Sequence, residues 1–305
     1  MSKPSLTARP AAIGASLMNP HVSVVMCARN TEKYIGNCLG SLLNQTFQNF
    51  EIVLVDDMSS DNTANIIMKF NDKRIRYIRN KEWLKIAKSR NKGLEYAKGK
   101  YIFFTDADCT VSPNWIEEGL RYLEHKDCIG VEGKITYVSE DYEPTFSDHV
   151  MENRSGGQFM TGNEAFTKNV VLAVGGFDER MGPLADRDLG LRVMEHGKIG
   201  FNTNMVVYHP RVTITPAMLI KSAPNIAKRV LLFKKHGERK FMLWRILFPS
   251  SLAKAVFPPL TFANLFLKRF RTADDFRLLP YTYVHVVLER LQLWKTSAME
   301  RVFLI

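Results

Sequence analysis

The chain has 305 residues, of which 46% are hydrophobic and 24% are charged, with a formal net charge of +11. This composition excludes a disordered chain, and the length suits one large domain or two small ones. Residues 211–305 hold 17 Lys and Arg against 5 Asp and Glu, so residues 1–210 carry a net charge of −1. A basic last third indicates an anionic partner: nucleic acid, anionic lipid or an acidic polymer.

The N-terminus and the cysteines give few signals. Residues 1–20 lack the apolar core of a signal peptide, so we expect a flexible lead-in. The four cysteines, Cys27, Cys38, Cys109 and Cys128, form no C-x-x-C pair. We therefore expect them to be free thiols that fill small spaces of the core in a reducing cytosol.

Apolar runs that indicate buried strands alternate with segments of helical spacing. The strands are predicted at residues 21–28, 51–55, 75–78 and 101–105. Helices are predicted between them, the last over residues 87–97. This alternation predicts an α/β fold with a mainly parallel sheet and helices on both faces.

Polar residues follow three of these strands. They are Asn30, Asp57 and the pair Asp106 and Asp108. Ligands of parallel α/β sheets bind beyond the carboxyl ends of the strands, so these groups are expected to converge there. Two carboxylates at the end of a buried strand are costly unless a cation neutralises them, and oxygen ligands suit Mg²⁺ or Mn²⁺. The alternative for Asp106 and Asp108 is a solvated turn.

Three segments of the chain carry a family resemblance. They are residues 23–67, which begin SVVMCARNTEKY, residues 89–109, which end in FFTDADC, and residues 160–197, which include MTGNEAF, GGFDER and ADRDLG. In order and spacing they resemble the family 2 glycosyltransferases, which have a GT-A fold, and the likeness covers about residues 21–210. It implies an enzyme that transfers a sugar from a nucleotide-sugar donor with inversion.

The resemblance implies a set of donor-binding residues. The nucleoside would be held by Ala28, Asn30, Glu32 and Asp57, and Asp57 has the alternative of capping the next helix. Arg90 or Lys88 would face the diphosphate, although each is equally suited to be an ordinary surface cation of a helix.

The same likeness implies a metal site for Mn²⁺ or Mg²⁺. Asp108 is the expected direct ligand, and Asp106 is expected either to bind the metal through water or to contact the ribose. His209 follows a strand-like segment at residues 205–208 and is a further possible metal ligand. The alternative for His209 is a hydrogen bond to a local partner.

Asp186 matches the position of the family's general base. The family has a Glu before this Asp, and here that position is Ala185. A single carboxylate is sufficient to take a hydroxyl proton, but Asp near a helix start is also favourable by capping alone. Gly162, Asn163 and Asp188 are expected on the sugar and acceptor side. Gly175 and Gly176 fit either a loop on that side or a plain tight turn.

The last third is predicted to be helical and basic. Its longest uncharged run, residues 255–267, is 13 residues long and contains two prolines, so no transmembrane helix is expected. Apolar stretches flanked by Lys and Arg favour contact with an anionic membrane surface. The alternatives are a helical subdomain packed on the catalytic core and a dimer surface.

These observations divide the chain into a lead-in (1–20), a GT-A catalytic domain (21–210) and a basic helical region (211–305). The predicted function is an inverting, metal-dependent glycosyltransferase that acts on a glycan or lipid-linked acceptor at the cytoplasmic membrane face, in cell-surface polysaccharide or glycolipid synthesis. The alternative is a non-catalytic scaffold that binds a nucleotide or a glycan. Ala185 favours this alternative, because it stands where the family has Glu. No nucleic-acid motif is present in the basic region, so nucleic acid is not expected as a partner. The oligomeric state stays open.

Overall fold

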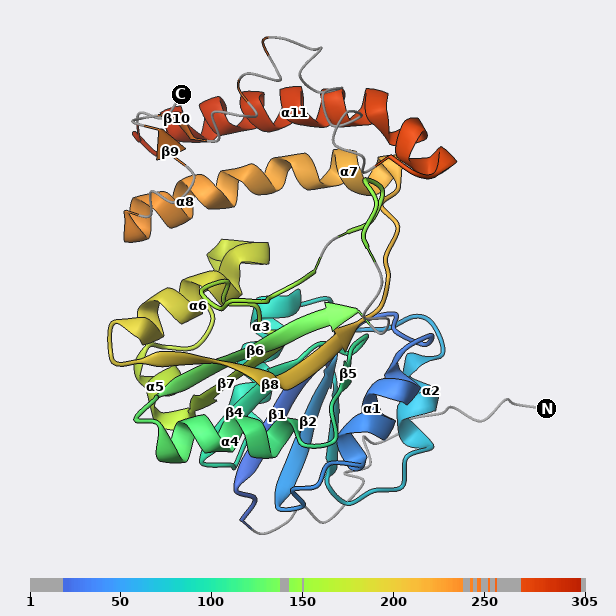
Figure 1. Cartoon of the computed structure of the whole chain (residues 1–305), viewed down its shortest axis with the longest axis vertical. Coiled ribbons are helices and arrows are strands. Elements are labelled where there is room, and N and C mark those ends of the chain that lie inside the picture. Colours follow the sequence, from blue (N-terminus) through green and yellow to red (C-terminus); the bar gives the residue numbers. More distant parts are fainter. Residues whose placement is uncertain are drawn as a thin grey trace, which may run out of the picture.

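A computed structural model describes residues 19–137, 143–149, 151–237 and 270–302, the short strands 242–243 and 246–247, and residues 252 and 256. An α/β layer built on one eight-stranded sheet lies below a layer of helices from the end of the chain (Figure 1). Apart from residues 19 and 20, the predicted lead-in lies outside the described residues.

The first half of the sheet is parallel, as predicted. It contains β1 (Val22–Ala28), β2 (Phe50–Asp56), β3 (Ile75–Arg79) and β4 (Tyr101–Thr105). β1 pairs with both β2 and β4, and β2 pairs with β3. These strands are the apolar, β-branched runs of the sequence, which favour strands that are buried on both faces. Their carboxyl ends therefore meet at one edge.

The second half of the sheet is mixed. β7 (Asn163–Thr167) runs antiparallel to β4 and to β6 (Gly130–Tyr137), while β8 (Ile199–His209) runs parallel to β6. The two-residue β5 (Thr110–Val111) closes the order β3-β2-β1-β4-β7-β6-β8-β5. Because β7 is antiparallel to β4, it begins at the edge where β4 ends.

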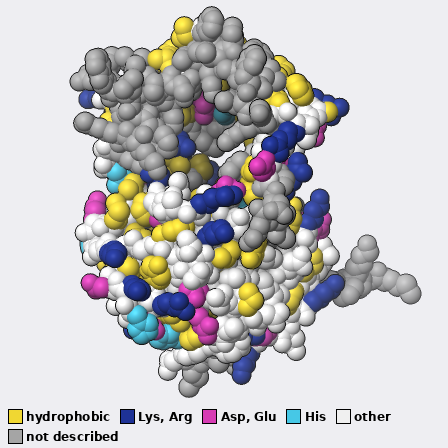
Figure 2. All heavy atoms as spheres, in the orientation of Figure 1, with side chains coloured by type: hydrophobic (Ala, Val, Ile, Leu, Met, Phe, Trp, Pro, Cys, Tyr) yellow, Lys and Arg dark blue, Asp and Glu magenta, His cyan; other side chains and the backbone are white. Residues whose placement is uncertain are grey.

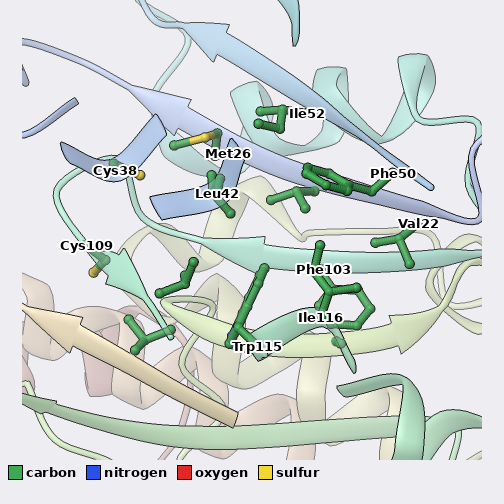
Figure 3. Close-up of a cluster of buried hydrophobic side chains, with 14 of the residues drawn as sticks. Val22, Met26, Cys38, Leu42, Phe50, Ile52, Phe103, Cys109, Trp115 and Ile116 are labelled. Carbon is green, nitrogen blue, oxygen red and sulfur yellow. The ribbon is translucent and has the colours of Figure 1, made fainter. Parts of the chain in front are cut away.

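Helices cover both faces of the sheet. One face carries α1 (Ile35–Leu43), α2 (Thr63–Met68) and α4 (Trp115–His125), and the other carries α3 (Ile86–Tyr96), α5 (Lys168–Ala173) and α6 (Ala185–Met194). On the first face the fully buried rings of Phe103 and Trp115 meet edge to face, with centroids 5.1 Å apart (Figure 3). This contact packs α4 against β4.

The described end of the chain is helical, as predicted. It contains α7 (Pro216–Ser222), η2 (Ala223–Asn225), α8 (Ile226–His236) and α11 (Ala273–Met299), with the short strands β9 (Met242–Leu243) and β10 (Ile246–Leu247). α8 and α11 pack side by side (Figure 1). Among the described helices, none has the length and apolar character needed to cross a bilayer.

Polar contacts bind α8 to the α/β layer. Lys235 Nζ lies 2.9 Å from Asp178, just before η1 (Glu179–Leu184), and Lys228 donates to the carbonyl of Arg180. Lys234 is paired with Glu300, the C-cap residue of α11. Three lysines of the basic region therefore make contacts within the protein. The predicted membrane contact also depends on the aromatic residues 244, 248, 257, 262 and 266 of the apolar stretches, and these lie outside the described residues.

Candidate active site

A cavity of about 360 Å³ opens at the carboxyl ends of β1 and β4. Four of the predicted site residues line it: Arg90, Asp106, Asp108 and Asp186. A second cavity, of about 390 Å³, adjoins the first and shares Cys27, Arg29 and Ile86 with it. Ala28 and Asp57 line this second cavity. The structure thus brings six of the predicted residues to one continuous depression, at the edge where an α/β sheet binds ligands.

Arg90 is the cation of the first cavity. It comes from α3, is 8% exposed, and its guanidinium lies 2.7 Å from the Asp106 carboxylate. Burial works against its charge, but Asp106, Cys27 and Asp186 outweigh that effect and raise its pKa. Lys88, the other cation offered by the sequence, is exposed on α3 and does not line this cavity.

Asp108, Cys109 and His209 form a cluster at the end of β4 and β8. Their ligand atoms lie within 4.8 Å of one another, and His209 Nε2 is 3.8 Å from Asp108 Oδ2. The Nδ1 atom of His209 bonds the carbonyl of Pro210, which leaves Nε2 facing Asp108. Burial keeps the Cys109 thiol protonated by raising its pKa, so the oxygen and imidazole donors fit a divalent cation better than the sulfur does.

Burial and the neighbouring Asp106 raise the pKa of Asp108, while His209 opposes the shift. A bound cation stabilises the charged form of a buried carboxylate such as Asp108, whose pKa a neighbouring carboxylate raises. The residues present therefore fit the group that the sequence predicted, Mn²⁺ or Mg²⁺.

Asp186 lies in the first turn of α6 and lines the first cavity. Burial raises the pKa of its carboxyl, Arg90 lowers it, and Asp106 raises it further. Its Oδ1 accepts the backbone N–H of Arg187, as a helix-capping side chain does. The carboxylate nevertheless lines the cavity. Ala185, which stands at the family's Glu position, is buried in the core beneath α6.

Asp57 is anchored beneath the second cavity. One carboxylate oxygen accepts from Asn80 Nδ2 at 2.9 Å and from the backbone N–H of Leu84 at 2.8 Å. Its own N–H donates to the carbonyl of Ala28. Neither partner belongs to α2, so Asp57 does not cap that helix. Asp56 instead accepts the N–H of Ser59 and holds the turn.

Asn30 and Glu32 are not brought to either cavity. Both are exposed, and both hold the loop before α2: Asn30 Oδ1 accepts the N–H of Ser60, and Glu32 Oε2 accepts the N–H of Asn62. Their position after β1 was predicted correctly, but their side chains serve the contact between two loops.

Gly162 and Asn163 differ in their placement. A Cβ on Gly162 would lie 3.2 Å from Asp106 Oδ2, so this glycine lies directly beside the predicted site. Asn163 is fully buried, and its amide donates to the carbonyls of Lys134 and Met205 and accepts from Trp115 Nε1. The expectation that Asn163 faces the acceptor is therefore corrected: it joins β7 to β6, β8 and α4.

Asp188 also departs from the acceptor-side expectation. It is fully buried, and its carboxylate is paired with Arg192, Lys235 and His236 at 2.7, 2.7 and 2.8 Å. Hydrogen bonds from Lys235 and His236 outweigh the effect of burial and lower its pKa. Asp188 faces α8, on the side of α6 away from Asp186, because two residues correspond to about 200° of helix rotation.

The glycine pair forms a tight turn. Gly175 and Gly176 have φ angles of 81° and 67°, and their N–H groups bond the carbonyls of Leu172 and Val171 at the end of α5. Of the two alternatives left by the sequence, the plain turn describes these residues.

The sequence analysis missed most of the residues that line the second cavity, among them Arg29, Trp83 and Asn225. The Arg29 guanidinium lies 4.6 Å from the centre of the Trp83 ring, and both line the cavity with Asn225 of η2. Arg29 directly follows β1, and this place at the carboxyl end of a parallel strand could have predicted it as a site residue. Trp83 and Asn225 reach the site through a loop and through the C-terminal region, so no local pattern points to them.

The model of glycosyl transferase family 2 matches residues 23–177, just over half of the chain. An uncharacterized glycosyltransferase of Haemophilus influenzae is 42% identical over 126 residues, 41% of this chain and 39% of that protein. The Escherichia coli protein WfgD, a UDP-Glc:alpha-D-GlcNAc-diphosphoundecaprenol beta-1,3-glucosyltransferase, is 34% identical over 122 residues, 40% of this chain and 46% of that protein. The alignments span less than half the length of these two relatives.

The fold has relatives among solved structures. The mannosyltransferase PcManGT of Pyrobaculum calidifontis, solved with GDP-Man and Mn²⁺, superposes with a TM-score of 0.59 and 16% identity, over 90% of this chain and 87% of that one. At this identity the likeness shows the fold, which is GT-A. The matched family model, which covers just over half of the chain, shows that the chain belongs to glycosyl transferase family 2.

Proposed function

We propose that this chain is an inverting, metal-dependent glycosyltransferase that moves a sugar from a nucleotide-sugar donor to a glycan or lipid-linked acceptor. One observation carries the proposal: Asp186, a half-buried carboxylate with a raised pKa, shares a single cavity with Arg90, Asp106 and Asp108. A candidate base and residues suited to a diphosphate and its metal thus line one space of about 360 Å³, which supports the proposal.

The donor nucleoside would occupy the second cavity. Ala28 and Asp57 line it, and the second carboxylate oxygen of Asp57, to which no described residue donates, can accept from a base N–H. The exposed ring of Trp83, backed by Arg29, offers a face for a planar base. Asn225 lies in the region proposed as the C-terminal unit (211–305), so this unit contributes to a donor site that otherwise belongs to the catalytic unit (21–210).

The diphosphate would lie in the first cavity. Arg90 supplies N–H donors that suit phosphate oxygens, and its charge is held in place by Asp106. Asp108 and His209 would hold the Mn²⁺ or Mg²⁺, with Asp106 beside them. A bound divalent cation supplies charge stabilisation for the departing nucleoside diphosphate. Gly162 keeps the space next to Asp106 open for the sugar.

Asp186 would act as the general base. It takes the proton of the acceptor hydroxyl as the hydroxyl oxygen bonds the anomeric carbon, and the bond from that carbon to the diphosphate oxygen breaks with its electron pair on the diphosphate. Because attack and departure occur on opposite faces of the carbon, the configuration inverts. Burial of Asp186 raises its proton affinity toward the range in which a base is effective.

The proposed acceptor is membrane-proximal, at the cytoplasmic face. WfgD acts on a diphosphoundecaprenol-linked sugar by its name, which supports a lipid-linked acceptor. On α11 the exposed side chains Tyr281, Val284, Leu288, Leu291 and Trp294 supply apolar and aromatic surface of the kind found at interfaces. On the face in Figure 2, Lys and Arg side chains are spread over both layers, with acidic side chains among them.

Flotation with vesicles tests the membrane part of the proposal. Binding to vesicles with anionic lipid and not to neutral ones supports it, and an oligonucleotide gel shift without flotation would instead favour a nucleic-acid partner. The vesicle result is independent of catalysis, so it separates attachment from chemistry.

A panel of sugar nucleotides with Mn²⁺ or Mg²⁺ tests the catalytic part, with release of nucleoside diphosphate measured with and without EDTA. One donor is expected to be hydrolysed slowly, and lipid-linked acceptor is expected to accelerate release. Asp186→Asn and Asp108→Ala should each abolish transfer while the protein keeps its fold. Nucleotide binding without turnover on any acceptor would favour the scaffold alternative. Full transfer by Asp186→Asn would exclude Asp186 as the base.

A further inference from the structure

Cys109 is a buried thiol beside the proposed metal site that the proposed function leaves unused. It directly follows Asp108 after β4, is 0% exposed, and its Sγ donates to Asp108 Oδ1 at 3.6 Å. The other oxygen of the same carboxylate, Oδ2, lies 3.8 Å from His209 Nε2. A carboxylate, a thiol and an imidazole therefore lie around one point at the ends of β4 and β8.

The backbone fixes the two buried members of this group. The N–H of Cys109 donates to the carbonyl of Asp106 at 3.1 Å and closes a tight turn after β4. The antiparallel pairing of β5 with β8 places Thr110 opposite Tyr208. One step beyond this ladder, Cys109 comes opposite His209, where side chains of neighbouring strands meet. The thiol and the imidazole are thus brought together by the sheet itself.

The three ligand atoms have a spacing close to that of a tetrahedral metal site. All of them lie within 4.8 Å of one another. Around a zinc ion with bonds of about 2.0–2.3 Å, neighbouring ligand atoms are roughly 3.3–3.7 Å apart, so a small closing movement of the side chains is sufficient. Mg²⁺ and Mn²⁺ prefer oxygen ligands, whereas a thiolate next to an imidazole selects Zn²⁺. The chemistry of the group therefore differs from that of Asp106 and Asp108 alone.

We propose that Asp108, Cys109 and His209 form a zinc site that competes with Mn²⁺ or Mg²⁺ for the proposed catalytic centre. This inference rests on the proposed function, because Asp108 and His209 are also the proposed ligands of the catalytic cation. Binding of Zn²⁺ forms a zinc–sulfur bond, and the proton of the thiol passes to solvent. A hard cation leaves the thiol protonated, so Cys109 is a ligand of the zinc form alone.

The place of the group in the structure makes zinc an inhibitor. Asp106 and Asp108 line the first cavity, but the buried Cys109 and His209 are not among its lining residues. A cation held by all three members of the group would therefore lie behind the wall of the cavity. Asp108 would then be unable to share a cation with Asp106 and the diphosphate, and the proposed stabilisation of the leaving group would be lost.

The absorption of Co²⁺ tests the site without any use of activity. Co²⁺ binds where Zn²⁺ binds, and it gives a strong near-ultraviolet band when a thiolate is one of its ligands. The reduced full chain should show this band, and Zn²⁺ should remove it. Cys109→Ser should lose the band. A wild type without the band, or an equal band in Cys109→Ser, would overturn the proposal.

Calorimetric titration with Zn²⁺ measures the contribution of the thiol. Cys109→Ser should bind Zn²⁺ at least about 100-fold more weakly, because even the loss of a group that supports a ligand costs about 10–100-fold in affinity. The affinity for Mn²⁺ should change far less, since Mn²⁺ prefers oxygen donors. Equal losses for the two metals would overturn the role of Cys109 in selecting zinc.

Cys128→Ser is the matched control for both measurements. Cys128 is also a buried free thiol, but it donates to the carbonyl of Lys126 and lies outside the group of three ligands. Cys128→Ser should keep the cobalt band and the zinc affinity of the wild type. Loss of the band in Cys128→Ser but not in Cys109→Ser would assign the thiolate to the wrong cysteine and overturn the proposal.

Inhibition of donor hydrolysis tests the consequence. With Mn²⁺ as the activating ion, Zn²⁺ should inhibit the wild type and Cys128→Ser at concentrations about 100-fold lower than Cys109→Ser, and excess Mn²⁺ should relieve the inhibition. Equal inhibition of the three proteins would overturn the inhibitory role. If the wild type hydrolyses no donor, the proposed function fails, and the cobalt band and the zinc titration still decide on the zinc site.

Discussion

The guanidinium of Arg90 and the carboxylate of Asp106 lie 2.7 Å apart and join α3 to the end of β4. The pair keeps a buried cation at the cavity and fixes the orientation of Asp106. Since Arg90 is only 8% exposed, its charge is poorly screened by solvent, and its effect on a bound diphosphate should be large.

Arg90→Gln is expected to lower kcat/KM by about 100-fold, the loss typical of removing one donor to a developing charge. Arg90→Lys keeps the charge but not the planar fork, so a smaller loss is expected. Steady-state release of nucleoside diphosphate measures both. Lys88→Gln is the matched control, because Lys88 is exposed on the same helix and lies outside the first cavity. A larger loss for Lys88→Gln than for Arg90→Gln would contradict the assignment.

Trp83→Ala is expected to weaken nucleotide binding. The ring is 58% exposed, stacks on Arg29 and lines the second cavity, so it can contact a base. Loss of an aromatic face is expected to raise the Kd of the preferred nucleoside diphosphate about tenfold, or about 1.4 kcal/mol. Calorimetric titration measures the change.

Trp294→Ala is the control for this measurement, because Trp294 is 43% exposed on α11 and lines neither cavity. Equal affinities of the wild type and Trp83→Ala would place the base elsewhere in the depression.

Asn163→Ala is expected to destabilise the protein without changing nucleotide affinity. The change leaves the carbonyls of Lys134 and Met205 and the indole N–H of Trp115 without their partner in the core. Unsatisfied buried groups cost about 1–3 kcal/mol each, and after local relaxation we expect a loss of about 3 kcal/mol in the free energy of unfolding. Urea denaturation measures it.

Asn65→Ala provides the comparison, since Asn65 is exposed on α2 and bonds only the side chain of Asn62 in the described contacts. If Asn163→Ala were as stable as the wild type and bound the donor more weakly, the result would instead support a contact between Asn163 and the sugar.

The sequence predicted the parts of the site that depend on short stretches of chain. The run Tyr101–Thr105 is apolar, and Asp106 and Asp108 follow it directly. One short stretch of sequence therefore predicts both the strand and the candidate metal ligands. β6 and β7 were not predicted, because they carry the buried Glu132, Asn163 and Glu164, whose burial depends on partners far along the chain.

Asp186 and Asp188 show the same limit within one helix. Both are Asp in the first turn of α6, and local chemistry gives them the same preference for a helix start. Their roles differ because His236 of α8, 48 residues further along the chain, contacts Asp188. No pattern near position 188 reports that contact, whereas the family resemblance pointed to Asp186 alone as the base.

Asp188→Asn is expected to reduce stability in a pH-dependent way. The buried carboxylate balances Arg192, Lys235 and His236, and removing one partner of a buried ion cluster costs about 3 kcal/mol or more at neutral pH. Because the folded pKa of Asp188 lies below its ordinary value of 3.8, its contribution is fully present above that value and is lost as pH falls through the folded pKa.

The free energy of unfolding, measured by urea titration at a series of pH values, should therefore differ most between the wild type and Asp188→Asn near neutral pH. The difference should shrink as pH falls below 3.8, because the carboxyl of the unfolded chain then takes up a proton more readily than that of the folded protein. Asp274→Asn is the control, because its side chain is 57% exposed and its pair with Arg277 is expected to contribute about 0–1 kcal/mol. A difference for Asp188→Asn that stays constant as pH falls would mean that packing, and not the charge, joins α6 to α8.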